Sequence, residues 1–504
     1  MIGTEKTSYS IAKLRELVNT GQIDEAKQYI RKYLVKISNP AGYLAWVPSE
    51  NKFEVHLMKD LKTVHIMPGI SAPYVVNGKI EKFSPLKWFL EENDDVYRQS
   101  NDVTQPREYE QCGQKYINLF PGYMHQEVKK YDDFSDEIKE GVEFVWNHIQ
   151  EVWCSNKEVS FQYVKKWIIN MVAGRKMQTC LYLKSEQGTG KSSITEFLMY
   201  KVLGKNIVHT TNDPSCVSGG WNSELVGKVL LVLEEMPTAS EHEWRSLANS
   251  IKHYITGKDF VVKEKMVREY VIANFLSMII NSNNNALPIP PDERRIFALD
   301  VSNKRVGDVR HFKKLHKYTN RDDVGEAFYW HCKENADPIF KEFAEMPVTT
   351  TKTDLIADHL HSLYKYIKDI FVLQHFGIDM KFSKFYEDYV AYCDLKKLKA
   401  DTKISLSKKL TDLTVPMVAK TNNVKYIEIS KADLLAIYNK KHWIHDTDDF
   451  EQPIEKKPKK KNKSKDKKEQ KHKKEKKNKA LLDDDNTDSD NDDKRANKVM
   501  NMFK

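Results

Sequence analysis

The sequence has few cysteines, and none of them belongs to a C-x-x-C pair. Six occur in 504 residues, at positions 112, 154, 180, 216, 332 and 393. Scattered cysteines argue against a disulfide framework or a zinc site and favour reduced thiols. The sequence also lacks an apolar run of about 18 residues and a signal-peptide pattern. We therefore expect an intracellular protein, cytoplasmic or nuclear, that neither spans a membrane nor is secreted.

Most of the chain also lacks a strong charge of one sign. The net formal charge is +9, but residues 451–504 hold 19 of the 81 basic and 12 of the 72 acidic residues. The remaining chain therefore carries 62 basic and 60 acidic residues, a net charge of +2. Any contact of this part with nucleic acid must come from a local basic patch, because there is no global positive field.

Residues 448–504 contain a Lys-rich block followed by an acidic block, "KKPKKKNKSKDKKEQKHKKEKKNK" and "DDDNTDSDNDD". Neither block can bury enough apolar surface to offset the entropy of ordering, so we expect a disordered tail. A solvated tail is one interpretation of its function. A non-specific nucleic-acid arm or a nuclear localisation signal is the other.

Apolar periodicity divides the rest of the chain into segments. Residues 1–125 are expected to form an α+β region that begins with two amphipathic helices broken at Gly21. Residues 126–177 have a helical pattern. Residues 178–305 alternate short apolar strands ("TCLYL", "KVLLVL", "FLSMII", "RIFALDV") with helical segments, which is typical of a mostly parallel α/β sheet covered on both faces.

Two further segments follow the α/β region. Residues 306–354 are predicted to form a connecting helical segment. Residues 355–447 show helix, helix, strand and helix in that order, which suits a winged-helix-like domain.

A phosphate-binding loop is predicted in "LYLKSEQGTGKSSITEFL", residues 181–198. An apolar strand enters the loop and an amphipathic helix leaves it, an order that aims backbone N–H groups and the positive helix end at phosphate. Gly188 and Gly190 permit close approach of the backbone. Lys191 would reach the β- and γ-phosphates, and the Ser192 hydroxyl would ligate Mg²⁺.

The predicted cofactors are ATP and Mg²⁺. The predicted nucleotide-binding residues are Ser185, Glu186, Gln187, Gly188, Thr189, Gly190, Lys191, Ser192 and Ser193. Ser185 stands where such loops usually have a Gly. A chance match is therefore the alternative to a working loop with one altered residue.

A second apolar strand, "KVLLVLEEMP", ends in Glu234 and Glu235, about 40 residues after the loop. Paired carboxylates at the end of a buried strand suit a Mg–ATP hydrolase, because one can hold the metal while the other polarises the attacking water. We assign Glu234 to the metal and Glu235 to the general base. A strand that simply emerges into solvent is the alternative.

Two later segments add polar residues to this pattern. The apolar strand in "FLSMIINSNNN" ends in Asn281, Ser282, Asn283 and Asn284, and an amide at that position could orient water against the γ-phosphate. "PPDERRIFALDV" carries Arg294 and Arg295, and Arg stabilises phosphoryl charge when a neighbouring subunit supplies it. An ordinary Asn-rich turn and a salt-bridged surface pair are the alternatives.

The order of these motifs resembles the superfamily 3 helicases, which are compact AAA+ ATPases of DNA viruses, phages and plasmids. The resemblance is to the helicase half of primase–helicase proteins. It is carried by "QGTGKSS", "GGWNSELVGKVLLVLEE", "IINSNN" and "DERRIFALDV", within residues 181–300, with weaker similarity over roughly 115–415.

The resemblance implies an ATP-dependent DNA helicase that assembles as a homo-oligomeric ring, a hexamer, on single-stranded or forked DNA. It also implies that Asn283 closes the third motif and that Arg294 or Arg295 is the arginine finger. The sequence does not choose between these two arginines.

The interval between the acidic pair and the Asn-rich turn, residues 251–271, is where the resemblance places a basic hairpin that faces the ring channel. A turn is predicted at 256–259, followed by an extended segment with alternate residues on one face. The candidate contacts to DNA phosphates are Lys258, Lys263 and Lys265. An exposed hairpin without DNA contacts is the alternative.

Two other functions fit the same motifs. One is a nucleic-acid-binding ATPase for replication initiation or genome packaging without unwinding, and the other is an AAA+ remodeller of proteins. The first 135 residues or so show no pair of metal-binding carboxylates flanked by strands. Primase activity is therefore expected to be absent or supplied by a separate primase or polymerase.

Overall fold

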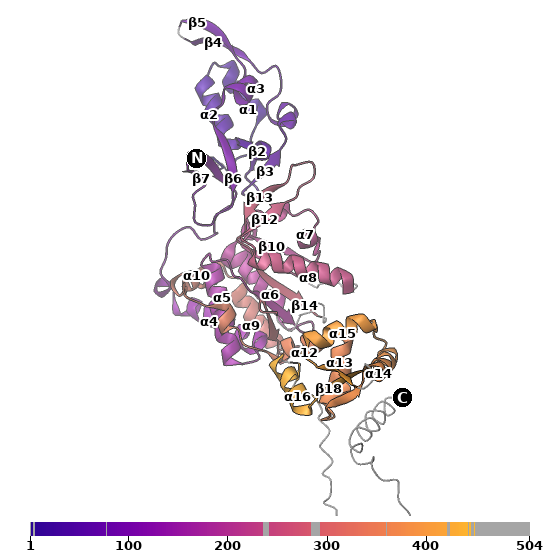
Figure 1. Ribbon diagram of the computed structural model, residues 1–504. Coiled ribbons are helices and arrows are strands. Elements are labelled where there is room, and N and C mark those ends of the chain that lie inside the picture. Colours follow the sequence, from indigo (N-terminus) through magenta and orange to yellow (C-terminus); the bar gives the residue numbers. More distant parts are fainter. Residues whose placement is uncertain are drawn as a thin grey trace, which may run out of the picture. The chain divides into compact units, whose positions relative to one another are not determined.

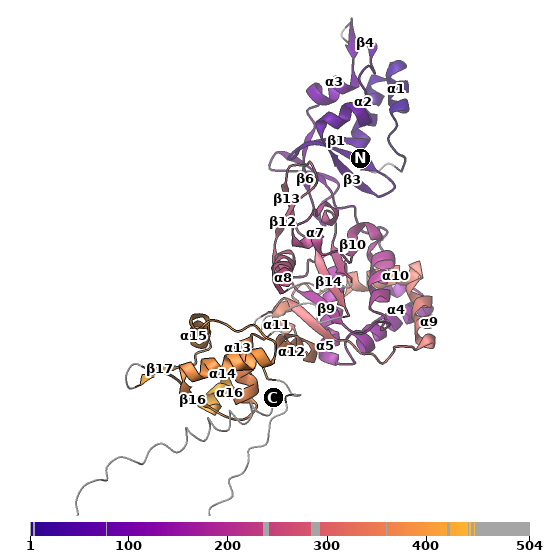
Figure 2. The ribbon, with the colours of Figure 1, turned by 90° about the vertical axis from the view of Figure 1, so that its right-hand side faces the viewer.

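The structure is a computed structural model that describes residues 2–3, 6–76, 78–234, 241–283, 293–358, 360–420, 424–441, 443–444 and 448. It divides into two compact units, one of residues 1–289 and 293–355 and one that includes residues 356–504. Figures 1 and 2 show the chain from two directions. No described helix is both long and apolar enough to cross a membrane.

The N-terminal region combines helices with a six-stranded sheet. Helices α1 (Ile11–Asn19) and α2 (Ile23–Tyr33) confirm the predicted pair, and Gly21 between them has a left-handed φ of 75°. The strands are β1 (Leu34–Ser38), β2 (Ala41–Val47), β3 (Lys52–His56), β6 (Val96–Ser100), β7 (Glu108–Gln111) and β8 (Gln114–Asn118), in the order β3-β2-β1-β6-β8-β7. A small hairpin of β4 (Ala72–Val76) and β5 (Lys79–Phe83) precedes the short helix α3 (Pro85–Lys87).

The central part of the first unit is built on a five-stranded sheet. Its strands are β9 (Cys180–Lys184), β10 (Val208–Thr211), β11 (Leu230–Leu233), β14 (Ser277–Ser282) and β15 (Ile296–Asp300), in the order β10-β11-β14-β9-β15. All neighbouring pairs are parallel, as predicted. Four strands coincide with the predicted apolar runs. Strand β10 was not predicted, because its sequence VHTT has no apolar run and its residues are only partly buried.

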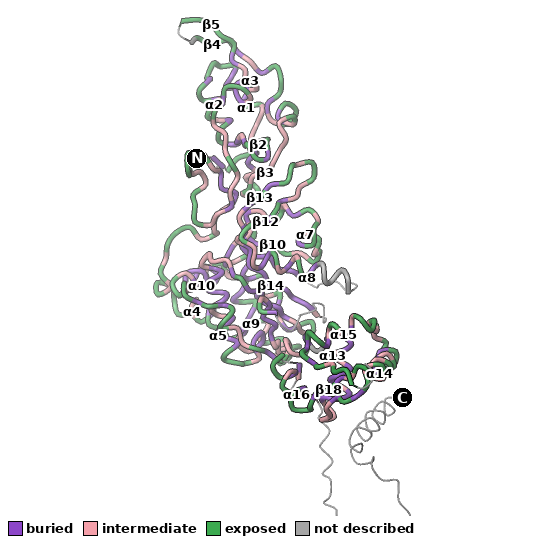
Figure 3. The backbone as a smooth tube through the Cα atoms, viewed as in Figure 1, coloured by how far each residue is buried: buried purple, intermediate pink, exposed green. Residues whose placement is uncertain are grey.

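Helices cover this sheet on both sides. Figure 2 shows α8 (Glu241–Thr256) on one side of β9 and β14, and α4 (Asp136–His148), α9 (Val309–Thr319) and α10 (Asp322–Glu334) on the other. The short helix α7 (Ser215–Ser218) lies beside α8, and α5 (Glu158–Val172) and α6 (Lys191–Phe197) complete the core. Figure 3 shows buried residues concentrated along the strands. Burial of both faces explains the near-continuous apolar sequence of β9, β11 and β14.

A two-stranded antiparallel hairpin extends from the sheet unit. It consists of β12 (Asp259–Val262) and β13 (Tyr270–Ala273). Toward the end of the unit, α11 (Glu342–Glu345) and α12 (Thr350–Asp358) follow α10.

The second unit contains the helices and the strand predicted for it. These are α14 (Phe382–Leu395), α15 (Lys403–Asp412), β18 (Val424–Ile429) and α16 (Lys431–Lys440). They follow α13 (Ser362–Ile367), a helix that was not predicted. Two further strands, β16 (Ile378–Lys381) and β17 (Met417–Lys420), pair with β18 in an antiparallel sheet of order β16-β18-β17. Each of these two strands has four residues, which is too short for a periodic pattern to show in the sequence.

Candidate nucleotide-binding site

The predicted phosphate loop, called the phosphate loop below, connects the carboxyl end of β9 to the start of α6. Gly188 and Gly190 have left-handed φ values of 80° and 88°. A Cβ atom at Gly190 would lie 2.9 Å from the Nε2 atom of His148 and 2.8 Å from a ring carbon of Phe312. Gly190 is therefore required both by its backbone conformation and by the side chains packed beneath it.

Lys191 is buried and bonded to both neighbouring strand ends. Its Nζ donates hydrogen bonds to the Ser185 Oγ at 2.7 Å and the Ser185 carbonyl at 3.0 Å, which follow β9. It also donates to the Asn283 Oδ1 at 3.1 Å, just after β14. The Ser185 hydroxyl, at the position where such a loop usually has a Gly, is thus a direct partner of the loop lysine.

Glu234 directly follows β11 and faces the first turn of α6. Its Oε2 accepts a hydrogen bond from the Ser192 Oγ at 3.3 Å, and its Oε1 accepts one from the Thr195 Oγ1 at 3.3 Å. Ser192 and Glu234, which the sequence predicts as the two metal ligands, therefore lie side by side. They come together because parallel strands end at the same edge of the sheet.

Asn281 is a site residue that the sequence reasoning did not select. It is 2% exposed, and its Nδ2 donates to the Glu234 Oε1 at 2.8 Å, while its Oδ1 has no hydrogen-bond partner among the described residues. The pairing of Leu233 with Ile280 places Asn281 next to Glu234. The signal in the sequence was weak, because Asn281 is one of five consecutive polar residues.

Two predicted residues of this site lie outside the described residues. Glu235, predicted as the general base, directly follows Glu234, and Asn284 directly follows Asn283. Their predicted roles stay predictions.

His148 and His311 lie beneath the phosphate loop. The His148 Nδ1 and the His311 Nε2 are 2.9 Å apart, and His148 is fully buried at the end of α4. Burial, assisted by His311, lowers the pKa of His148 to about 4. Helix α4 therefore meets the loop through an imidazole that is neutral at pH 7, and α9 meets it through Phe312.

The two candidate arginines lie at the opposite edge of the sheet. The Arg295 carbonyl accepts a hydrogen bond from the Cys180 N–H at 2.7 Å, at the amino ends of β9 and β15. Arg295 pairs with the buried Glu293 at 3.4 Å, and Lys252 pairs with the same carboxylate at 3.0 Å. Neither arginine can therefore complete the phosphate loop of its own chain.

Arg294 differs from Arg295 in its surroundings. It is exposed and lies over the Phe343 ring at 5.4 Å from the ring centre, and no carboxylate within the described part of the chain pairs with it. Of the two arginines, Arg294 is the more exposed, and Arg295 is partly buried and paired.

The structure corrects the predicted form of the basic hairpin. Residues 256–259 join α8 to β12, and the hairpin turn lies at 263–269 instead. The extended segment ends at Val262, so Lys263 and Lys265 belong to the turn and not to one face of a strand, and Lys258 precedes β12. The turn was misplaced because Thr-Gly-Lys-Asp is a common turn sequence that here ends a helix.

Asn222 fixes one end of the hairpin turn. It is buried, its Oδ1 accepts from the Lys263 N–H at 2.6 Å, and its Nδ2 donates to the Val261 carbonyl at 2.8 Å. The preceding residue, Trp221, is 64% exposed. An exposed aromatic ring therefore adjoins the backbone that holds Lys263. In the sequence, this segment contributed only to the resemblance to superfamily 3 helicases, and neither Trp221 nor Asn222 was predicted as a site residue.

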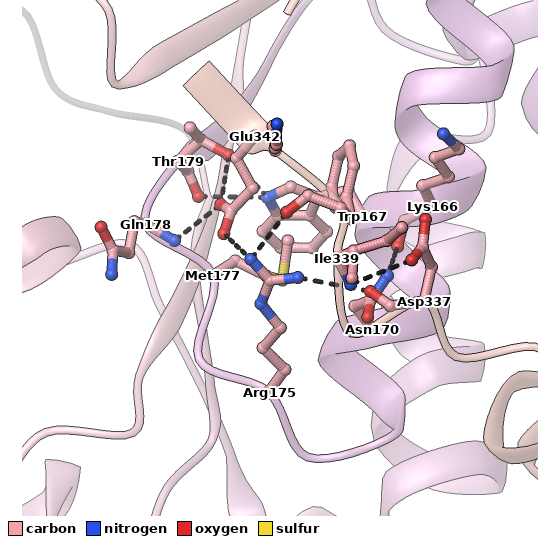
Figure 4. Close-up of polar contacts among 12 residues, drawn as sticks. Lys166, Trp167, Asn170, Arg175, Met177, Gln178, Thr179, Asp337, Ile339 and Glu342 are labelled. Atoms are coloured by element: carbon pink, nitrogen blue, oxygen red, sulfur yellow. Dashed lines mark hydrogen bonds and ion pairs between the residues drawn. The ribbon is translucent and has the colours of Figure 1, made fainter. Parts of the chain in front are cut away.

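A buried polar network fixes the amino end of β9. Figure 4 shows Glu342 pointing toward Arg175, Gln178 and Thr179. The Glu342 Oε2 accepts from the Gln178 N–H at 2.7 Å and the Thr179 Oγ1 at 3.0 Å, and Arg175 pairs with Oε1 at 3.3 Å. Burial raises the pKa of Glu342. This network holds the strand that leads into the phosphate loop.

Comparison with known proteins points to the same region. A family model described as a family of unknown function (DUF5906) matches residues 183–295. Over 210 residues, 41% of this chain, the sequence is 23% identical to the DNA primase-polymerase of Nitratiruptor phage NrS-1. That match spans 28% of the length of the phage protein.

Two solved structures of the NrS-1 C-terminal region share the fold. One apo structure has a TM-score of 0.53 at 15% identity and covers 79% of this chain and 95% of its own. An A-form apo structure has a TM-score of 0.50 at 15% identity, with coverages of 79% and 96%. At this identity the likeness shows that the chain shares the fold of the NrS-1 C-terminal region.

Proposed function

We propose that this chain is an ATP-driven DNA helicase of a phage or related mobile element, with an AAA+ core that works as a homo-oligomeric ring. The observation that carries the proposal is the convergence of Lys191, Ser192, Glu234, Asn281 and Asn283 at one edge of a parallel sheet. A phosphate loop beside a carboxylate and two amides is the arrangement that phosphoryl transfer requires. The relation to a phage replication protein supports the biological setting.

The donor set fits Mg²⁺ bound with ATP. Mg²⁺ takes oxygen ligands at about 2.1 Å in octahedral geometry, so neighbouring ligands lie roughly 3 Å apart. The Ser192 Oγ and Glu234 Oε2 are 3.3 Å apart. Mg²⁺ would neutralise charge on the phosphates, while Lys191 exchanges its Ser185 and Asn283 contacts for phosphate oxygens. We assign the general-base role to Glu235.

Arg294 would act on the neighbouring subunit in the proposed ring. Both arginines stand at the sheet edge away from their own phosphate loop, and Arg294 is exposed while Arg295 is paired with Glu293. A guanidinium supplied across a subunit boundary stabilises charge on the phosphoryl group as it transfers. Its greater exposure favours Arg294 over Arg295 for this role.

The DNA-binding surface of the ATPase unit would comprise the β12–β13 hairpin and Trp221. Lys263 and Lys265 supply positive charge in the turn, with Lys258 at its base. Trp221 offers a ring on which a base can stack, and stacking contributes about 1–3 kcal/mol per base without sequence preference. A combination of basic and aromatic side chains suits an enzyme that moves along single strands.

The test is ATP hydrolysis with and without single-stranded DNA, paired with unwinding of a forked duplex. Lys191→Ala and Glu235→Gln should both abolish hydrolysis, and Glu235→Gln should still bind ATP because the metal and phosphate contacts remain. Lys313→Ala, a change at an exposed lysine of α9, is the matched control and should leave both activities intact.

The outcomes separate the candidate functions. If single-stranded DNA stimulates hydrolysis but no strand is displaced, the result favours an ATPase for replication initiation or genome packaging over a helicase. Stimulation by a protein client alone would indicate a remodeller. Full hydrolysis by Lys191→Ala would contradict the proposed site itself.

A further inference from the structure

The connection from α14 to α15, together with most of α15, is strongly basic. Residues 395–409 contain six Lys and one Asp. The one Asp, Asp401, pairs with Lys409 at 2.6 Å. The other five lysines are exposed, at positions 396, 397, 399, 403 and 408. The segment therefore presents a local excess of positive charge in a chain whose body is nearly neutral.

These lysines lie on the connection between two consecutive helices, α14 and α15, and on α15 itself, and the β17–β18 hairpin follows. Leu406 and Leu410 on the inner side of α15 are fully buried. Ile404, Lys408 and Thr411 on the outer side are exposed. The Ser407 Oγ lies 3.7 Å from the Met417 Sδ, so α15 packs beside the β17–β18 hairpin. In helix–turn–helix proteins the second of two consecutive helices enters the major groove of DNA. By its order in the chain, α15 corresponds to that second helix.

Exposed apolar side chains occur on the same elements. Within the described part of the second unit, the large hydrophobic side chains that are exposed are Leu395, Ile404, Val418 and Val424. They lie at the end of α14, on α15 and in the β17–β18 hairpin, and Ile404 is 76% exposed. Apolar side chains on a recognition helix can contact thymine methyl groups in the major groove.

We propose that α15, the preceding turn and the β17–β18 hairpin form a binding site for double-stranded DNA. Lys396, Lys397, Lys399 and Lys403 would contact phosphates, and Ile404 and Lys408 would face the base edges. Lys397 also adopts a left-handed φ of 55°, a conformation that usually selects Gly or Asn at a helix end. Duplex RNA is a poor fit, because its major groove is too narrow to admit a helix.

This site is separate from the proposed ATPase surface and does not depend on hydrolysis. The first unit would hold a single strand through its hairpin, and the second unit would hold a duplex. Lys191→Ala should therefore bind duplex DNA as tightly as the native chain does.

The experiment measures binding of a labelled blunt DNA duplex by anisotropy at several salt concentrations, without ATP, on full-length chains. Lys403→Gln/Lys408→Gln on α15 is compared with Lys431→Gln/Lys440→Gln on α16, a matched pair of exposed lysines. Each phosphate contact contributes about one to the slope of log K against log salt. Of the α15 pair only Lys403 is assigned to a phosphate, so the double variant should lower the slope by about one and weaken binding by about tenfold or more. The α16 pair should change neither quantity, and the Lys-rich tail is common to all chains.

Several outcomes would overturn the proposal. If both lysine pairs weaken duplex binding equally, the binding depends on overall charge and not on α15. If the α15 pair leaves duplex binding unchanged, the proposed site is excluded. Equal affinity for duplex RNA of the same sequence would exclude insertion of α15 into the groove. A change in sedimentation without a change in DNA binding would indicate that a second copy covers this face. The α15 variant should keep ATP hydrolysis that is stimulated by single-stranded DNA. If the native chain shows no such hydrolysis, that result contradicts the proposed function and leaves the duplex-binding proposal intact.

Discussion

Asn281 and Asn283 are two residues apart at the end of β14, yet they contact different parts of the site. Asn281 holds the Glu234 carboxylate at 2.8 Å, and Asn283 accepts from Lys191 at 3.1 Å. The alternation of side chains along an extended backbone does not explain this difference, because residues two apart share a face. The departure of the chain from the sheet after Ser282 separates them.

Substitution of Asn281 tests its role as a positioning residue. In Asn281→Ala, Glu234 loses its shortest hydrogen bond, which is worth about 1.5–3 kcal/mol for a charged partner. We expect kcat to fall about tenfold to a hundredfold while the Kd for ATP changes less than fivefold. Asn281→Asp should be worse, because a second carboxylate would repel Glu234. An unchanged kcat in a folded Asn281→Ala chain would remove Asn281 from the site.

His148 predicts a pH dependence of stability. Its pKa in the folded protein is about 4, below the ordinary value of 6.5. Between these two values the unfolded chain binds the extra proton, so the free energy of unfolding falls as the pH falls from about 6.5 toward 4. His148→Gln removes this titration. The native chain should lose about 1 kcal/mol more than the variant between pH 7.5 and pH 5.5 in urea unfolding followed by tryptophan fluorescence.

Other histidines contribute to the same pH range, and burial also lowers the pKa of His65 to about 4. The comparison therefore uses the difference between two chains that share His65. Identical losses in both chains would show that His148 is not neutral and buried in the folded protein.

At the scale of elements, a turn that is remote in sequence positions the basic hairpin. Asn222 lies about 40 residues before Lys263 and bonds to the backbone on both sides of Val262. A two-stranded hairpin is only marginally stable by itself. The hydrogen bonds from the buried Asn222 side chain to the backbone of the β12 end therefore stabilise this hairpin. The same turn presents Trp221 to solvent.

Trp221 and Asn222 make separable predictions for the hairpin. Trp221→Ala should weaken binding of single-stranded DNA by about fivefold or more through lost stacking, with basal hydrolysis unchanged. Asn222→Ala leaves the Lys263 N–H and the Val261 carbonyl without their partner and should lower stability by about 1–3 kcal/mol as well. Tyr200→Ala, at another exposed aromatic residue, is the control and should alter neither quantity. Equal DNA binding by the Trp221 and Tyr200 variants would contradict the stacking role.

At the scale of the whole molecule, the proposed active site requires two chains. A mixing experiment tests this directly. Lys191→Ala has an inactive phosphate loop but an intact Arg294, and Arg294→Ala has the reverse. Each variant alone should be inactive, and an equimolar mixture should recover hydrolysis at about a quarter of its interfaces if subunits assemble at random.

Arg295→Ala serves as the control for this mixture. Arg295 pairs with the buried Glu293, so its loss should lower stability, but Arg295→Ala keeps Lys191 and Arg294 and should hydrolyse ATP without any partner variant. A mixture of Lys191→Ala and Arg294→Ala that stays inactive would rule out a site completed by a neighbouring subunit.

The sequence alone predicted those features that depend on local chemistry. The parallel strands, the strand–loop–helix order around Gly188 and Gly190, and the carboxylate after β11 were accessible, because buried strands are continuously apolar and positions of positive φ favour Gly. The two N-terminal helices and those of the second unit followed from their periodicity.

Only the tertiary structure decided which residues meet. The contacts of Asn281 with Glu234, of Ser185 with Lys191 and of Asn222 with Lys263 join segments whose spacing in sequence carries no signal. The tertiary structure also showed that Arg295 is paired with the buried Glu293 whereas Arg294 is exposed. The two arginines are adjacent in sequence, so no sequence pattern reports this difference. A pattern along one chain reports propensity and burial, whereas the partner of a polar side chain is set by how strands and helices pack in space.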